Sequence, residues 1–136
     1  MSQVDQVEIQ LSKSQNFLLP SGKELKLSDI LHFCYGLSET ETQILMTLIR
    51  SSPKLAHELE QELQLSKAIV NRSLNKLLSM GLVKRTKDTE KKRRRPKYVY
   101  YIPNFEELKD KLVKEIEDCT NSIRNLISIR FNPATH

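Results

Sequence analysis

The chain has 136 residues, of which 38% are hydrophobic, and a net charge of +5 at pH 7, which suits one domain with its own core. Its apolar runs are too short to cross a bilayer and its N-terminus lacks a charged-then-apolar leader pattern, so we expect no membrane segment. Cys34 and Cys119 form neither a CxxC pair nor a metal-ligand cluster, and we expect two reduced, partly buried thiols.

Residues 1–27 predict an N-terminal arm or a short hairpin. Val7, Ile9 and Leu11 alternate with polar residues, which allows a short strand. The segment 20–23 (Pro-Ser-Gly-Lys) has the composition of a turn. An ordered arm that lies on a partner subunit is the alternative.

Two helices with local start and stop signals are predicted next. Ser28 can cap the first helix, and Gly36 is placed to end it, since glycine accepts the left-handed conformation after a helix. Ser38 and Glu41 have the spacing of a capping box, and the helix that they begin should run to about Arg50.

A helix-turn-helix is predicted between residues 52 and 80. Ser52-Pro53 indicates the start of a third, shorter helix, because proline suits the first helical position. Gln64-Leu65 forms the turn, and Ser66 caps a fourth helix about three residues later. The apolar stripes of the two helices consist of Leu55, Ala56, Leu59 and Leu63, and of Val70, Leu74, Leu77 and Leu78.

A two-stranded hairpin follows, with strands at Leu82–Lys87 and Lys97–Ile102 and a highly charged tip between them. Pro96 fits the start or edge of a strand, because it has no N–H to donate. Pro103-Asn104 then ends the second strand.

The last predicted element is a long helix from about Phe105 to Arg130. Its apolar stripe is wider than a strict coiled-coil seam, so it suits a bundle as well as a coiled coil. A helix of this length cannot bury its whole stripe on a compact domain, so we expect a homodimer; folding back over the first helix is the alternative. The expected interface consists of Leu108, Leu112, Ile116, Cys119, Ile123, Leu126 and Ile127. Cys119 should serve there as a small hydrophobe, with an interchain disulfide as the alternative.

These elements predict a mainly α fold with a small β wing: an arm or hairpin at 1–27, a winged helix-turn-helix at 28–103 and a dimerisation helix at 104–136.

Positive charge is concentrated in residues 66–101. This segment has twelve Lys and Arg residues and only Asp88 and Glu90 against them, a net +10, which leaves −5 for the rest of the chain. Such asymmetry indicates one surface that faces a polyanion, and on a winged helix that polyanion is double-stranded DNA.

The fourth helix is expected to enter the major groove, where Asn can pair with adenine and Arg or Lys with guanine. The candidate residues on it are Ser66, Lys67, Ala68, Asn71, Arg72, Asn75 and Lys76. Arg72 is an equal candidate for a phosphate contact.

The wing is expected to reach the DNA backbone or the minor groove. Its candidate residues are Lys87, Lys91, Lys92, Arg93, Arg94, Arg95 and Lys97. Tyr98, Tyr100 and Tyr101 are expected to be structural, and stacking on unpaired bases is the weaker alternative.

The sequence gives no support for catalysis. His32, His57 and His136 are scattered, and there is no Gly-rich phosphate loop, HExxH or nucleophile elbow. His57 is more simply solvated with Glu58 and Glu60 than a metal ligand, so we expect no enzyme, metal or cofactor.

Residues 37–85 resemble the winged-helix domain of TrmB-like and MarR-like transcriptional regulators, which are common in archaea. The matching features are the Leu-Ser-x-x-Glu start, Leu59 and Leu63, and the run from Ser66 through Val70, Arg72, Leu74 and Leu77 to Gly81-Leu82-Val83. Arg95-Pro96-Lys97-Tyr98 resembles the returning wing strand, and the small size is similar to short archaeal Lrp-related, Sulfolobus-type regulators. The resemblance implies a dimer that binds DNA through helix and wing, with the terminal helices at the interface.

Three positions depart from that family pattern. Gln64 stands where such turns often have Gly, and Ala68 and Ile69 stand where Ser or Thr often faces DNA. Direct base readout is therefore expected to be modest, with phosphate and shape contacts dominant.

The leading hypothesis is a dimeric, sequence-preferring DNA-binding transcription regulator, cytoplasmic and nucleoid-associated. The alternatives are a weakly specific architectural chromatin protein and a protein-interaction winged helix of the transcription machinery. A small-molecule effector is left open, with a pocket near His32, Cys34 and Tyr35 as its conceivable place.

Overall fold

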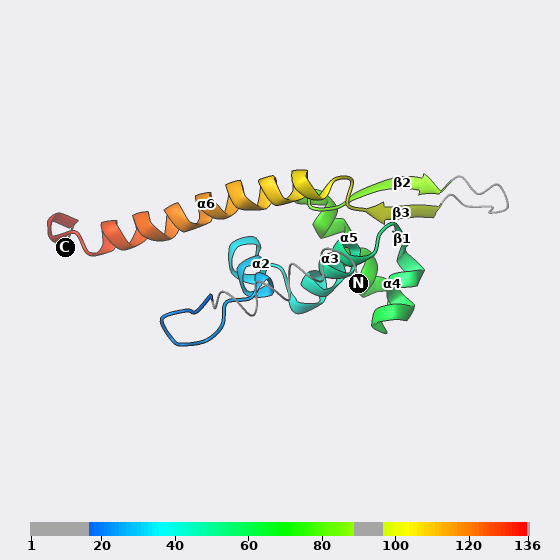
Figure 1. Cartoon of the computed structure of the whole chain (residues 1–136), viewed down its shortest axis with the longest axis horizontal. Coiled ribbons are helices and arrows are strands. Elements are labelled where there is room, and N and C mark those ends of the chain that lie inside the picture. The colour runs from blue at the N-terminus through cyan, green and yellow to red at the C-terminus, as the bar shows by residue number, and fades with distance from the viewer. Residues whose placement is uncertain (1–16, 89–96, 136) are drawn as a thin grey trace.

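The computed structural model describes residues 17–88 and 97–135, and its elements confirm a mainly helical fold with a small antiparallel sheet. They follow in the order α2 (Leu27–Tyr35), α3 (Glu39–Arg50), β1 (Lys54–Leu55), α4 (Ala56–Leu63), α5 (Lys67–Ser79), β2 (Lys84–Asp88), β3 (Lys97–Tyr101), α6 (Phe105–Arg130) and a 3₁₀ turn at Pro133–Thr135. Helices α2 to α5 and the sheet make one body, and α6 extends from it on the side opposite the wing (Figure 1).

Three of the four longest helices begin at side-chain caps. In α3 the Ser38 N–H donates to Glu41 Oε1 (2.8 Å) and the Glu41 N–H to Ser38 Oγ (3.1 Å), as the capping box predicts. Ser66 Oγ accepts from the Ile69 N–H (3.2 Å) at the start of α5, and Asn104 Oδ1 accepts from two N–H groups at the start of α6. The predicted start of α2 is wrong by two residues: the N-cap is Lys26 and not Ser28, and the helix begins at Leu27.

The prediction for Ser52-Pro53 is wrong, because a strand and not a helix follows it. Lys54–Leu55 forms β1, which pairs antiparallel with Tyr100 and Val99 of β3, and α4 begins only at Ala56. The wing is therefore part of a three-stranded sheet in the order β1-β3-β2. Strand β1 anchors the wing to the helix-turn-helix.

A single hydrophobic core holds the helices and the base of the sheet together. Val83 and Ile102 bring the two ends of the wing into it, and Leu108 brings in the first turn of α6. Its members are Leu31, Leu37, Ile44, Leu45, Leu48, Leu59, Val70, Leu74, Leu77, Leu82, Val83, Tyr100, Ile102 and Leu108.

The described part of the N-terminal region forms a tight turn. The Leu19 N–H donates to the carbonyl of Lys23 (2.8 Å), and Leu18 and Glu24 form an isolated antiparallel bridge. The strand that we predicted at residues 7–11 lies outside the described residues. Over residues 17–88 and 97–135, no helix is both long and apolar enough to span a bilayer.

The turn between α4 and α5 contains a residue in the left-handed conformation. Gln64 has φ 55° and ψ 48°, and its N–H donates to the carbonyl of Glu60 at the end of α4. This conformation costs an L-residue roughly 1 kcal/mol or more, which is why glycine is common at such positions.

We predict that Gln64→Gly is more stable than Gln64→Ala by about 1 kcal/mol, because only glycine relieves the left-handed strain. This is the reverse of their order inside a helix. Urea unfolding of the two variants and the parent measures the difference. An Ala variant equal to or more stable than the Gly variant would show that the turn is not strained.

Candidate nucleic-acid interface

Helix α5 turns one side to the core and the other to solvent. Val70, Leu74 and Leu77 are fully buried, so the helical period places Ala68, Arg72 and Asn75 on the opposite, exposed side. These three residues form the centre of the outward face, as the sequence predicts.

The flank of α5 that carries Lys67 and Asn71 faces the wing. Both residues line an open cavity of about 380 Å³ that also includes Lys97 and Tyr98 of β3. Lys67 and Asn71 are one turn apart, so they lie along this groove and not at the centre of the outward face. His57 borders the groove from α4.

The described part of the wing presents cations from both strands. Lys87 of β2 lies opposite Tyr98 of β3, and the side chains of Lys87 and Lys97 are exposed. The Arg85 guanidinium lies 4.1 Å from the centroid of the Tyr98 ring. The predicted contacts Lys91, Lys92, Arg93, Arg94 and Arg95 lie outside the described residues.

The tyrosines of β3 have structural contacts. Tyr100 is 7% exposed and belongs to the core, and Tyr98 holds Arg85 against its ring. These contacts agree with the structural role expected for the two tyrosines.

Lys76, which we expected to face DNA, has contacts within the domain. Its ammonium donates to the carbonyl of Gly36 (2.8 Å) and lies 3.0 Å from Glu41 Oε1. These partners join α5 to the turn between α2 and α3. We therefore leave Lys76 out of the DNA-facing set.

Glu41 is the acidic partner in this contact, and its pKa is lowered from its ordinary value of 4.5. Burial of the carboxyl group raises the pKa, but hydrogen bonds from the Ser38 N–H and from Lys76, with the charge of Lys76, outweigh burial. The ionised form is thus the one that the fold favours.

The free cations of the interface differ from Lys76. In the described part of the chain, Lys67, Arg72, Lys87 and Lys97 have no carboxylate within 4.0 Å. They lie on α5, β2 and β3, with Lys67 and Lys97 in the groove itself, so their charge is available to a polyanion.

One edge of the apolar stripe of α6 packs against the winged-helix body of the same chain. Leu108 is 8% exposed, Leu112 packs against the core, and the Tyr35 hydroxyl donates to Glu115 Oε1 (2.8 Å). Burial of the phenol, with Glu115 beside it, raises the pKa of Tyr35. We had placed Leu108 and Leu112 at a dimer interface, and their contacts within the chain revise that prediction.

The prediction of two reduced thiols is wrong. Cys34 of α2 and Cys119 of α6 form a disulfide within one chain, with their Cα atoms 5.9 Å apart. Neither cysteine is a free thiol, and Cys119 is not available for a disulfide with a second chain. Their sequence separation of 85 leaves no local sequence signal for the pairing.

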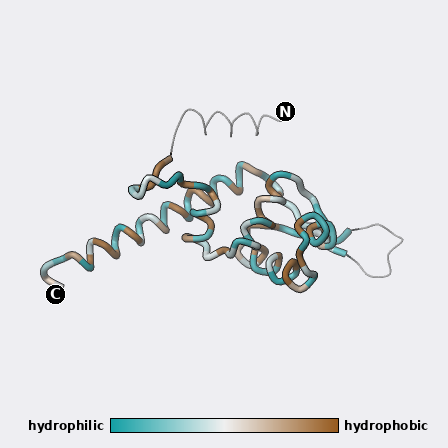
Figure 2. The backbone as a smooth tube through the Cα atoms, turned by 90° about the horizontal axis from the view of Figure 1, so that it is seen from below, coloured by the Kyte–Doolittle hydropathy of each residue, from teal (hydrophilic) through white to brown (hydrophobic). Residues whose placement is uncertain are grey.

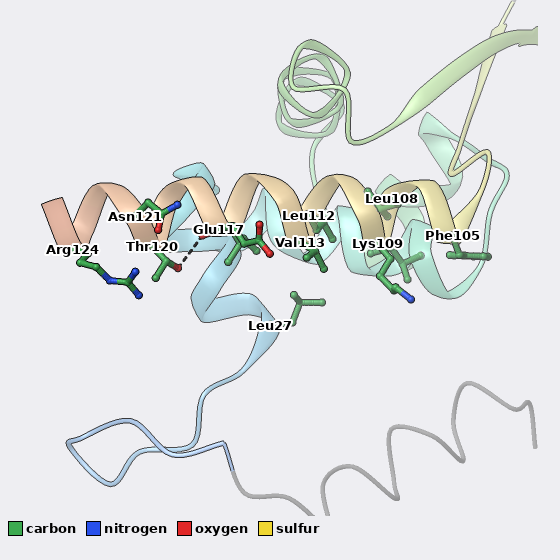
Figure 3. A pocket seen from close by; sticks show the side chains of 12 residues that line it. Leu27, Phe105, Leu108, Lys109, Leu112, Val113, Glu117, Thr120, Asn121 and Arg124 are labelled. Atoms are coloured by element: carbon green, nitrogen blue, oxygen red, sulfur yellow. Dashed lines mark hydrogen bonds between the residues drawn. The ribbon is translucent and has the colours of Figure 1, made fainter.

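The other edge of the α6 stripe is open. An apolar cavity of about 790 Å³ lies along it and is bordered by Leu27, Phe105, Val113 and Ile116 (Figure 3). Hydrophobic positions recur along the whole of α6, including the part that projects beyond the body (Figure 2). Ile127, in that part, is 53% exposed.

No group of three His, Cys, Asp or Glu residues within 17–88 and 97–135 is arranged to hold a metal ion. His57 is exposed, and the Nδ1–H of His32 donates to the carbonyl of Leu37 (2.7 Å). Neither histidine is placed as a metal ligand by its described neighbours.

A winged helix with an exposed cationic recognition helix defines the chain as a transcriptional regulator of the winged-helix type. A possible transcriptional regulator from Methanosarcina mazei has the same fold, with a TM-score of 0.69 and 16% identity over 85% of this chain and 97% of its own. The ST1889 protein of the archaeon Sulfolobus tokodaii has a TM-score of 0.64 and 28% identity over 74% of this chain and 93% of its own.

The family follows from the sequence match. The model of the family described as "Sugar-specific transcriptional regulator TrmB" matches residues 31–106, more than half of the chain. The chain belongs to the TrmB family of transcriptional regulators. It is also 22% identical, over 84% of its length, to a Methanocaldococcus jannaschii protein described as uncharacterized, and the match covers 93% of that protein.

We predict that Glu41→Gln lowers the free energy of unfolding by roughly 1 kcal/mol near neutral pH, because it removes the charge that Lys76 faces. The folded pKa of Glu41 is depressed, so its contribution is present above pH 4.5 and is lost as the pH falls through the lower folded value. Urea unfolding at neutral pH and at about pH 3 measures the convergence of variant and parent.

The control for this prediction is Asp110→Asn, which likewise neutralises a carboxylate, on an exposed part of α6 away from the open cavity. It should leave stability near neutral pH almost unchanged. If Glu41→Gln remained equally destabilising at acidic pH, its effect would not come from the ionised carboxylate.

Proposed function

We propose that the protein is a dimer that binds double-stranded DNA, with α5 in the major groove and the wing on the neighbouring backbone or minor groove. The observation that supports this most directly is the exposed, unpaired cationic surface on α5, β2 and β3. The fold matches a regulator family, and this surface coincides with the helix that such a fold presents to DNA.

The proposal gives the residues of α5 two different roles. Arg72 and Asn75, at the centre of the outward face, are placed for base edges, where Arg pairs with guanine and Asn with adenine. Lys67 and Asn71, on the flank beside the wing, are placed for the sugar-phosphate backbone. Lys87 and Lys97 extend the phosphate contacts along the wing.

Base readout by this helix is limited by Ala68 and Ile69. Ala68 offers only a methyl group, which suits the methyl of thymine, and Ile69 is 38% exposed on the other flank. Phosphate contacts and DNA shape then supply a large share of the binding, and two half-sites are needed for useful specificity.

The second half-site requires a second copy of the chain. The open edge of the α6 stripe has Phe105, Val113, Ile123 and Ile127 between 39% and 56% exposed, and they recur at helical spacing over more than twenty residues. Burial of this stripe against the same stripe of a second copy removes it from water and places one α5 on each side of the pair.

The function is tested by selection of duplexes from a random 30-base-pair pool, followed by titration of the enriched duplex at two salt concentrations. We expect affinity to fall steeply with salt, because each neutralised phosphate releases counterions. A preference below roughly tenfold over random DNA favours the architectural alternative, and absent duplex binding contradicts the proposal.

We predict that Arg72→Ala weakens binding to the enriched duplex by about tenfold to a hundredfold, since a bidentate base contact contributes about 1–3 kcal/mol. Fluorescence anisotropy with the enriched and a random duplex measures the loss for each. Equal losses on both duplexes would move Arg72 to the phosphate-contacting group. The control is Lys114→Ala, which removes one positive charge from the outer side of α6 and should change affinity little.

We predict that Ile127→Glu converts the dimer to a monomer, because it places a charge on the open stripe. Sedimentation velocity measures the change in mass. Asn125→Glu adds the same charge on the opposite side of α6 and should remain dimeric. A variant of Ile127 that stays dimeric would mean that another surface joins the subunits.

A further inference from the structure

The disulfide ties the end of one helix to the middle of another. Cys34 is the second-last residue of α2, and Cys119 lies midway along α6. Beyond this bond, residues 121–130 of α6 are all exposed and the helix projects from the body (Figure 1). Among the described bonds between α6 and the body, the disulfide is therefore the one nearest to the C-terminal end of α6.

The residues that follow Cys34 connect this point to the recognition helix. The Tyr35 hydroxyl donates to Glu115 of α6 (2.8 Å), and the next carbonyl along the chain, that of Gly36, accepts from Lys76 of α5 (2.8 Å). We call residues 34–36 the joint. It is bonded to α6 at one end and to α5 at the other.

The sulfur atoms can be reached from solvent. Cys34 and Cys119 are both partly exposed and border an open hollow of about 450 Å³. A small thiol fits a space of this size, so reduction does not require unfolding.

We propose that the Cys34–Cys119 disulfide is a redox-active site, and that its reduction by a dithiol lowers DNA affinity by releasing α6 from the joint. The inference rests on the proposed function, because α6 sets the separation of the two α5 helices only in a dimer. With the bond intact, each recognition helix is fixed to the dimer helix through residues 34–36. With the bond broken, the described contacts that still hold α6 to the body include Tyr35–Glu115 and the packing of Leu108 and Leu112.

The reduction is a thiol–disulfide exchange with a dithiol as the reductant. One thiolate of the dithiol attacks a sulfur of the pair and forms a mixed disulfide, and the other cysteine leaves as a thiolate that takes up a proton. The second thiol of the reductant then attacks the reductant sulfur of the mixed disulfide. This closes a disulfide within the reductant and releases the remaining cysteine. Two electrons and two protons pass to the protein, and the reductant becomes a disulfide.

The surroundings of the pair favour an uncharged reductant. Glu115 and Asp118 border the same hollow, and Cys34 lies in the last turn of α2, at the negative end of the helix dipole. An approaching anion is repelled there, and the leaving thiolate is disfavoured. A neutral dithiol such as dithiothreitol should therefore reduce the bond faster than glutathione, which carries a net negative charge. The ratio of the two rates should be larger than the ratio of the two reagents' intrinsic reactivities.

The first test measures the bond itself. The purified protein is alkylated under denaturing conditions before and after treatment with dithiothreitol or glutathione, and its mass is measured. We expect no alkylation before reduction and two alkyl groups after it. Asp118→Asn should speed reduction by glutathione more than reduction by dithiothreitol. Two alkyl groups without any reductant would overturn the inference.

The second test measures the consequence. Oxidised protein, reduced protein and a Cys34→Ala/Cys119→Ala variant are titrated with the enriched duplex, and amide exchange is followed at Gly36 and along α5. We expect the reduced protein and the variant to bind about tenfold more weakly, with faster exchange at these amides. The variant must not respond to the reductant.

The outcomes separate the two proposals. If the oxidised protein binds no duplex, the proposed function fails and this inference fails with it. If the oxidised and reduced proteins bind equally well, with equal amide exchange, the function stands and only the redox site is overturned. If reduction lowers the DNA affinity of the parent protein but the Cys34→Ala/Cys119→Ala variant binds as tightly as the oxidised protein, the reductant acts elsewhere and the inference is wrong.

Discussion

The width of the apolar stripe on α6 is the constraint on which the arrangement of the molecule depends. One edge, with Leu108 and Leu112, completes the core of the winged helix, and the other edge, with Val113 and Ile127, has no described partner. Exposed apolar surface is worth about 25 cal/mol for each Å² removed from water, so a long open stripe strongly favours association. If a second copy covers the open edge, as we propose, α6 is core on one edge and interface on the other and joins the recognition helix to that copy.

The elements that sequence predicted best are those whose ends are fixed locally. The caps at Ser38, Ser66 and Asn104 act over two or three residues, and the helices begin where these caps indicate. Strand β1 was missed because two residues carry no periodicity; Lys54–Leu55 is a strand only through its pairing with β3, more than forty residues away. The pairing of Cys34 with Cys119 was missed for the same reason, since it depends on how α2 and α6 pack.

The sequence predicted those features of the candidate site that depend only on the helical period, namely which side chains of α5 face outward. The period of α5 places Arg72 and Asn75 outward once Val70 and Leu74 are buried. It does not reveal that Lys76 is used by Gly36 and Glu41, because those partners lie 40 and 35 residues away. A positive charge on a recognition helix is therefore evidence for DNA contact only when its neighbours in space leave it unpaired.

The limited base readout of α5 gives the geometry of the pair a larger role. Ala68 stands where a polar side chain would contact base edges, so each half-site would discriminate weakly between DNA sequences. The separation of the two half-sites would then contribute more to specificity. That separation is fixed by whatever holds α5 to α6. In this chain the connection includes the shared core around Leu108 and the joint at residues 34–36, with the disulfide on one side of the joint and the Lys76–Gly36 hydrogen bond on the other. In the proposed DNA-bound dimer, weak readout by the helix is offset by a rigid joint between helices, and a change at the joint would act on specificity without altering any residue placed against DNA.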